Sequence, residues 1–164
     1  MNPLLAQFLT ESRDLLEMTG ASLLALEKAP DDAAQVDELF RAVHTLKGNS
    51  GLFPEYIAFT RLVHAGEDVL VDVREGARAF SPEITNRLLD AMDLIAVMLD
   101  QIEGGGEIEQ VARECAEEQV AVLRSLRAGE APAARVVSAE PAGSVPRPEW
   151  SRVFGDQSST VAFR

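Results

Sequence analysis

Apolar residues recur along most of this chain at the spacing of an α-helix. The clearest run is Val36, Leu39, Phe40, Val43 and Leu46, at i, i+3, i+4, i+7 and i+10, which forms one stripe along a helix. Similar runs predict helices over residues 3–27, 31–50, 55–74, 81–103 and 107–126. Because each stripe must be buried against the others, we predict an all-α fold, an up-down four-helix bundle with an additional fifth C-terminal helix.

Residues that start and stop helices flank these segments. Asn2 and Pro3 suit the start of the first helix, and Ser81 followed by Pro82 suits the start of the fourth. Gly76 is expected to end the third helix. On the apolar faces we expect, among others, Ile57 in the third helix and Val111 and Cys115 in the fifth.

The composition changes at Gly129. The stretch APAARVVSAEPAGSVPRPEW has four prolines and no apolar period, which is typical of a linker. We therefore predict a domain over residues 1–128 and a flexible linker or tail over 129–164, the start of an interdomain linker.

The chain is acidic, with 27 acidic and 15 basic residues and a net charge of −12. Such a chain repels phosphate backbones, so nucleic-acid binding is not expected. The charge suits a basic partner surface, although it equally suits ordinary solubility. The N-terminus lacks a basic region before its apolar residues, and no apolar run has the length of a membrane span. We therefore expect a cytoplasmic protein without membrane insertion.

A histidine in the second helix has unusual neighbours. In FRAVHTLKGNSGLF, His44 shares a helix face with Gly48 and Gly51, and Lys47 flanks it. A glycine inside a helix costs about 1 kcal/mol relative to alanine. On the histidine's own face, Gly48 gives close access from outside, whereas Gly51 can simply end the helix.

A second histidine lies in LVHAGEDVL of the third helix, where His64 and Glu67 are i and i+3. If the second and third helices are antiparallel neighbours, this pair can face His44. A carboxylate that accepts from one ring nitrogen leaves the other unprotonated and nucleophilic. With the cation of Lys47, these are the groups that phosphoryl transfer to nitrogen requires.

The two histidine motifs resemble those of a known protein family. LFRAVHTLKGNSGLF resembles the phosphorylation motif of histidine-phosphotransfer (HPt) domains, H-x-x-K-G, and more narrowly that of the N-terminal domain of CheA-type chemotaxis histidine kinases. HAGEDVLVDVREG resembles that family's next helix, and the likeness covers about residues 2–126. It departs from the family at Asn49 and Ser50, where glycine and alanine are usual.

The resemblance implies a role for each residue that matches the motifs. His44 would be phosphorylated, Lys47 would assist the phosphoryl group, and Glu67 would bond to the His44 ring. His64 would support that network, and Gly48 would keep the site open for a docking partner.

The resemblance also implies partners and cofactors. No nucleotide-binding glycine-rich box is visible, so this chain would not use ATP alone, and whether it counts as an enzyme by itself stays open. It would accept a phosphoryl group from a histidine-kinase catalytic domain and pass it to an aspartate of a response regulator receiver domain. ATP would bind the kinase domain and Mg²⁺ the regulator. The chain would be the N-terminal part of a two-component sensor kinase.

Two other functions fit the same residues. His44, His64 and Glu67 could be ligands of a zinc site, although Lys47 would repel the metal. Alternatively the chain could be a helical interaction module in which His44 does no chemistry. Substitution of His44 separates that module from a phosphotransfer domain.

Overall fold

The computed structural model describes residues 2–127 as an all-helical protein. Within that range the chain forms α1 (Pro3–Lys28), α2 (Ala33–Ser50), a short 3-10 helix η1 (Pro54–Tyr56), α3 (Ile57–Arg74), α4 (Pro82–Gly105) and α5 (Gln110–Ser125). The predicted linker at 129–164 lies outside the described residues.

The helix ends follow from local hydrogen bonding. The side chains of Asn2, Asp32 and Ser81 each accept a hydrogen bond from a backbone N–H in the first turn of α1, α2 and α4. They satisfy donors that a helix leaves without a partner at its N-terminus. Gly76 and Gly106 have φ of 75° and 76°, a left-handed conformation that glycine adopts without strain and that ends α3 and α4.

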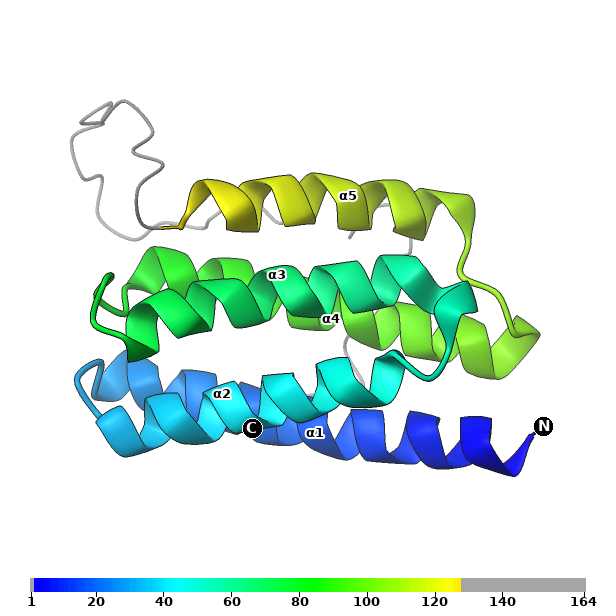
Figure 1. Ribbon diagram of the computed structural model, residues 1–164, viewed down its shortest axis with the longest axis horizontal. Coiled ribbons are helices and arrows are strands. Elements are labelled where there is room, and N and C mark those ends of the chain that lie inside the picture. Colours follow the sequence, from blue (N-terminus) through cyan, green and yellow to red (C-terminus); the bar gives the residue numbers. More distant parts are fainter. Residues whose placement is uncertain (1, 128–164) are drawn as a thin grey trace.

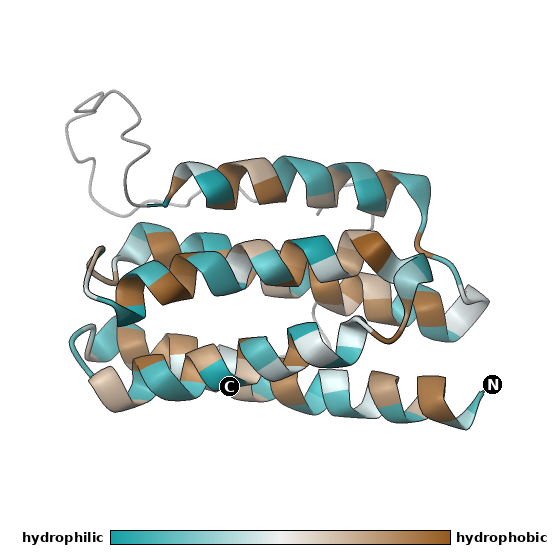
Figure 2. Ribbon diagram, viewed as in Figure 1, coloured by the Kyte–Doolittle hydropathy of each residue, from teal (hydrophilic) through white to brown (hydrophobic). Residues whose placement is uncertain are grey.

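Consecutive helices run in opposite directions (Figure 1). α1 contacts α2 and α4, α3 contacts α2 and α4, and α5 lies against α3 and α4. Each helix carries both hydrophobic and hydrophilic residues along its length (Figure 2), and the hydrophobic ones form one continuous core. Leu39 and Leu46 of α2 and Phe59 and Leu62 of α3 are fully buried, which fixes α2 beside α3.

Two predicted helix starts were wrong by a few residues. The segment from Pro54 to Tyr56 is a 3-10 turn before α3, and α5 begins at Gln110 rather than at 107. Two predicted packing residues were wrong as well, because Ile57 is 51% exposed and Val111 is 39% exposed.

The alanines of α5 explain the error at Val111. The buried residues of α5 are Ala112, Ala116, Val120 and Leu123. The small alanine side chains allow this face of α5 to pack against α3 and α4. Val111 then lies on the solvent-exposed side of the helix. Cys115 is half-buried.

Within residues 2–127 no helix combines the length and the apolar character that crossing a membrane requires.

Candidate functional site

The antiparallel packing of α2 and α3 brings His44 against Glu67, 23 residues later in the chain. The His44 Nδ1 atom lies 2.9 Å from the Glu67 Oε2 atom. The side chain of His44 is 60% exposed, whereas that of Glu67 is 8% exposed. An exposed imidazole is therefore anchored on a carboxylate that belongs to the interior of the bundle.

The second oxygen of Glu67 is also occupied. The ammonium of Lys47 donates to Glu67 Oε1 at 2.7 Å, and its side chain is 29% exposed. Burial by itself raises the pKa of the Glu67 carboxyl. The hydrogen bonds and charges of Lys47 and His44 outweigh burial, and the pKa is lowered. Glu67 is thus an ionised carboxylate that accepts on both oxygens.

An ionised carboxylate fixes the tautomer of His44. Because a carboxylate can only accept, the proton of the neutral imidazole must lie on Nδ1. The lone pair is then on Nε2, for which residues 2–127 offer no hydrogen-bond partner. The neutral form of His44 would therefore present its free lone pair at Nε2 on an exposed side chain, which is the arrangement of an activated nucleophile.

The surface beside His44 is open at Gly48. A Cβ atom built at Gly48 would have no heavy atom within 4 Å, whereas one built at Gly51 would lie 3.4 Å from the Gly48 carbonyl oxygen. Gly51 is the C-cap of α2. The open surface next to His44 is therefore due to Gly48, and Gly51 ends the helix.

His64 lies apart from these three residues. Its side chain is 58% exposed, and its Nε2 atom is 3.5 Å from Oδ1 of Asp68, one turn further along α3. Within the described part of the chain, no hydrogen bond joins His64 to His44, Lys47 or Glu67. The structure therefore brings together His44, Lys47 and Glu67, and the supporting role of His64 stays a prediction.

The zinc alternative finds no support in the described residues. In that part of the chain, no group of three or more histidine, cysteine, aspartate or glutamate side chains could hold a metal ion. His64 faces Asp68 rather than the other two predicted ligands, which explains why the expected set does not assemble.

The structure also shows contacts that sequence reasoning missed. The Ser50 hydroxyl donates to the Lys47 carbonyl at 2.8 Å and accepts from the Thr60 hydroxyl at 3.0 Å, so it ties the end of α2 to α3. Asn49 donates to Glu11 of α1 at 3.1 Å. The two residues that depart from the family motif therefore join α2 to its neighbours.

One neighbour of His44 has a second contact that the sequence analysis did not predict. Phe40 packs against the core, as its place in the apolar stripe of α2 predicted, and its ring also stacks on the His44 ring, with centroids 5.7 Å apart and planes 18° apart. The i, i+4 spacing of two ring side chains was the available signal.

Known proteins resemble this chain in sequence and in fold. The family model described as "Hpt domain" matches residues 3–105. The chain is 35% identical over 142 residues to the chemotaxis protein CheA of Bacillus subtilis; the match covers 87% of this chain and 20% of that protein. The chain thus spans about a fifth of the length of this curated relative.

Two solved structures resemble the fold. One is the phosphorylated P1 domain of CheA3 in complex with CheY6 from R. sphaeroides. It is 31% identical with a TM-score of 0.68, and the match covers 77% of this chain and 100% of that one. The other is the solution structure of the histidine phosphotransfer domain of CheA, 28% identical with a TM-score of 0.69, covering 76% of this chain and 92% of that one.

Proposed function

The chain belongs to the Hpt domain family, and on this premise we propose that His44 is the phosphoryl acceptor of a chemotaxis phosphorelay. The observation that carries the proposal is the hydrogen bond between His44 Nδ1 and the buried carboxylate of Glu67. It leaves Nε2 as the nucleophile on an exposed side chain next to the open surface at Gly48.

Uptake of the phosphoryl group is a displacement at phosphorus. The Nε2 lone pair forms a bond to the γ-phosphorus of an ATP held by a kinase domain, the bond from that phosphorus to the bridging oxygen breaks, and ADP leaves. The ring keeps its Nδ1 proton and gains a positive charge, which the ionised Glu67 stabilises. Lys47 has further N–H donors beyond the one that Glu67 accepts, and these can contact a phosphoryl oxygen.

In the transfer of the phosphoryl group to a response regulator, the bond to Nε2 that formed during uptake is broken again. A carboxylate oxygen of a response regulator attacks the phosphorus, the bond to Nε2 breaks, and His44 returns to its neutral tautomer. Mg²⁺ bound by the regulator would neutralise the phosphoryl oxygens, and this domain would itself bind no cofactor. The solved P1 domain in complex with CheY6 supports a receiver of that kind as the partner.

The surrounding protein is part of the same proposal. The relatives that match are CheA chemotaxis proteins of which this chain covers a small share. We propose that it is the phosphotransfer part of a two-component sensor kinase in the cytoplasm, with the domain at residues 1–128 and a linker after it. We further propose an up-down bundle of α1–α4 with α5 added. The contacts between successive helices support this arrangement.

Phosphoryl uptake tests the proposal. The full chain is mixed with labelled ATP and an isolated chemotaxis-type kinase core, and the chemical stability of the label is measured. We expect a label that is labile in acid, stable in base, and absent from His44→Gln. If the folded protein takes no label while the same kinase core labels a control phosphotransfer domain, phosphotransfer by His44 is excluded. The chain would then be better explained as a helical interaction module.

A further inference from the structure

The ring of Phe40 restricts a motion that Glu67 leaves possible. The hydrogen bond from Nδ1 to Glu67 fixes one atom of the His44 ring. A side chain that is 60% exposed can still turn about that contact. Phe40 lies one turn earlier on α2 with its ring nearly parallel to the imidazole, so turning the His44 ring out of plane would break the stacking.

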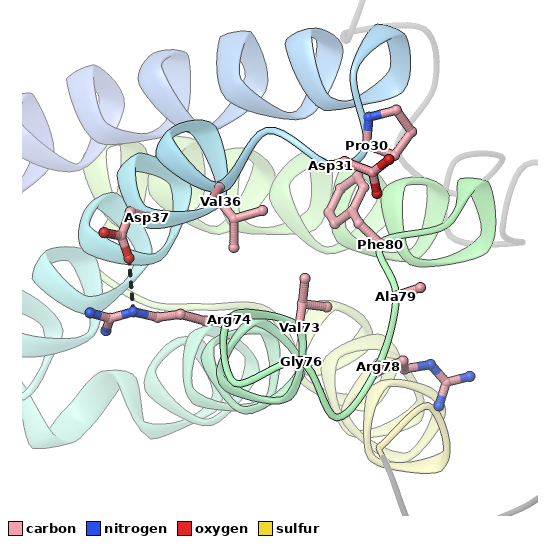
Figure 3. A pocket seen from close by; sticks show the side chains of 11 residues that line it. Pro30, Asp31, Val36, Asp37, Val73, Arg74, Gly76, Arg78, Ala79 and Phe80 are labelled. Carbon is pink, nitrogen blue, oxygen red and sulfur yellow. Dashed lines mark ion pairs between the residues drawn. The ribbon is translucent and has the colours of Figure 1, made fainter.

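Phe40 is itself held from α3. The guanidinium carbon of Arg74 lies over the Phe40 ring, 4.6 Å from its centre. Arg74 Nε is 2.8 Å from Asp37 Oδ1, and Figure 3 shows the Arg74 side chain extending from α3 to Asp37 on α2. A planar guanidinium can stack on an aromatic face while it donates to a carboxylate. Phe40 also packs against the core, so both helices fix its ring.

The plane of the imidazole matters for the chemistry at Nε2. The Nε2 lone pair lies in the ring plane, and the attacked phosphorus must lie on the line of that lone pair, opposite the leaving oxygen. A ring that turns about its contact with Glu67 spends less time with the lone pair on this line. A fixed plane therefore raises the fraction of His44 that is ready to react.

We propose that Phe40 is a positioning residue for His44, and that Arg74, anchored on Asp37, holds Phe40 in place. The inference rests on the proposed function of His44 and adds to it the group that sets the direction of attack. The contribution of an aromatic pair corresponds to a change of about two- to tenfold in the aligned fraction.

The first measurement needs no phosphoryl transfer. In the full chain, the Hα–Hβ couplings of His44 report the rotamer about its Cα–Cβ bond, and the cross-relaxation from the His44 ring protons to the Phe40 ring and to the His44 Hα reports the plane of the imidazole. We expect one rotamer in the wild type and averaged couplings in Phe40→Leu, which keeps an apolar side chain but removes the flat ring. Phe80→Leu, the same change at the end of the bundle (Figure 3), should leave the His44 couplings unchanged.

The second measurement is the rate of phosphoryl uptake. Phe40→Leu should lower kcat by about two- to tenfold with the KM for the kinase core unchanged, and Phe40→Tyr, which keeps the ring, should restore kcat. Arg74→Gln should have a smaller effect of the same kind. Arg61→Gln, at an exposed arginine of the same helix that has no ion pair within residues 2–127, is its control.

Several outcomes would overturn the proposal. A single His44 rotamer in Phe40→Leu would show that the ring is fixed without Phe40. Averaged His44 couplings in Phe40→Leu with an unchanged uptake rate would show that Phe40 has no role in the reaction. A raised KM with unchanged kcat in the same variant would show that Phe40 contributes to docking of the kinase core instead. If the wild type took no label, the proposed function would fail, while the couplings would still decide whether Phe40 positions His44.

Discussion

The two histidines of the described chain have almost the same exposure and very different partners. The side chains of His44 and His64 are 60% and 58% exposed. His44 meets a carboxylate from another helix that is 8% exposed, at 2.9 Å. His64 meets Asp68 of its own helix, which is 31% exposed, at 3.5 Å.

Exposure therefore does not distinguish a histidine that is held by a buried carboxylate from one that meets a carboxylate of its own helix. A solvated carboxylate one turn away can move and be hydrated, so the partner of His64 fixes neither its tautomer nor its orientation. A buried carboxylate whose two oxygens both accept hydrogen bonds cannot move without losing bonds that water would not replace. Glu67 therefore fixes the tautomer and the orientation of the neutral His44 ring.

The largest expected difference is between the two histidine substitutions. His44→Gln should abolish phosphoryl uptake, because the amide of glutamine cannot act as the nucleophile. His64→Gln should lower the uptake rate by no more than about threefold, since its contact is a solvated pair of small energetic weight. Labelling of both variants by the same kinase core measures the difference. A loss in His64→Gln as large as that in His44→Gln would show that the two histidines act as one unit.

The two carboxylates provide the next comparison. Glu67→Gln should lower uptake on the order of 10- to 100-fold, because a neutral amide no longer fixes the Nδ1 tautomer and leaves Lys47 without its counter-charge. Asp68→Asn, the matched change beside His64, should leave uptake nearly unchanged. Equal rates for the two variants would contradict the role assigned to Glu67.

The pH dependence of stability sharpens this comparison. The pKa of Glu67 is lowered below its ordinary value of 4.5, so its ionised form stabilises the fold fully above that pH. The contribution is lost as the pH falls through the lowered pKa. Thermal or urea unfolding should therefore show wild type more stable than Glu67→Gln near neutral pH, with the two converging in acid. A constant difference at all pH values would mean that packing, rather than charge, accounts for it.

The smallest expected effect concerns the open surface at Gly48. Gly48→Ala should stabilise the protein by up to about 1 kcal/mol, since alanine favours a helix and its Cβ would meet nothing within 4 Å. Gly48→Leu should also be tolerated in the fold, but it should raise the KM for the kinase core several-fold because the side chain stands where a partner approaches. Unfolding and uptake measured on both variants separate the two effects. An unchanged KM in Gly48→Leu would show that access at this position is not needed.

Much of this protein could be predicted from local sequence. The apolar period predicted every long helix, and Asn2 and Ser81 marked two helix starts, because caps and amphipathic stripes depend on residues within a turn or two. The motif around His44 predicted Lys47 and Gly48 as its neighbours. The motif in the third helix predicted Glu67 together with His64, and of these two only Glu67 contacts His44. The errors at Ile57 and Val111 arose because an apolar residue at the edge of a stripe can turn either way, depending on how closely the neighbouring helix approaches.

The sequence by itself determined an all-helical domain up to about residue 126, and a histidine with a lysine and a glycine on the next turn of the same helix. The resemblance implied that Glu67 meets His44, and only the tertiary structure showed that His64 contacts Asp68 instead of joining that contact. That outcome depends on how α2 and α3, which are in direct contact, lie against each other. The tertiary structure also decided the contact of Arg74 with Phe40, since a side chain on one helix reaches a ring on another only after both helices have packed.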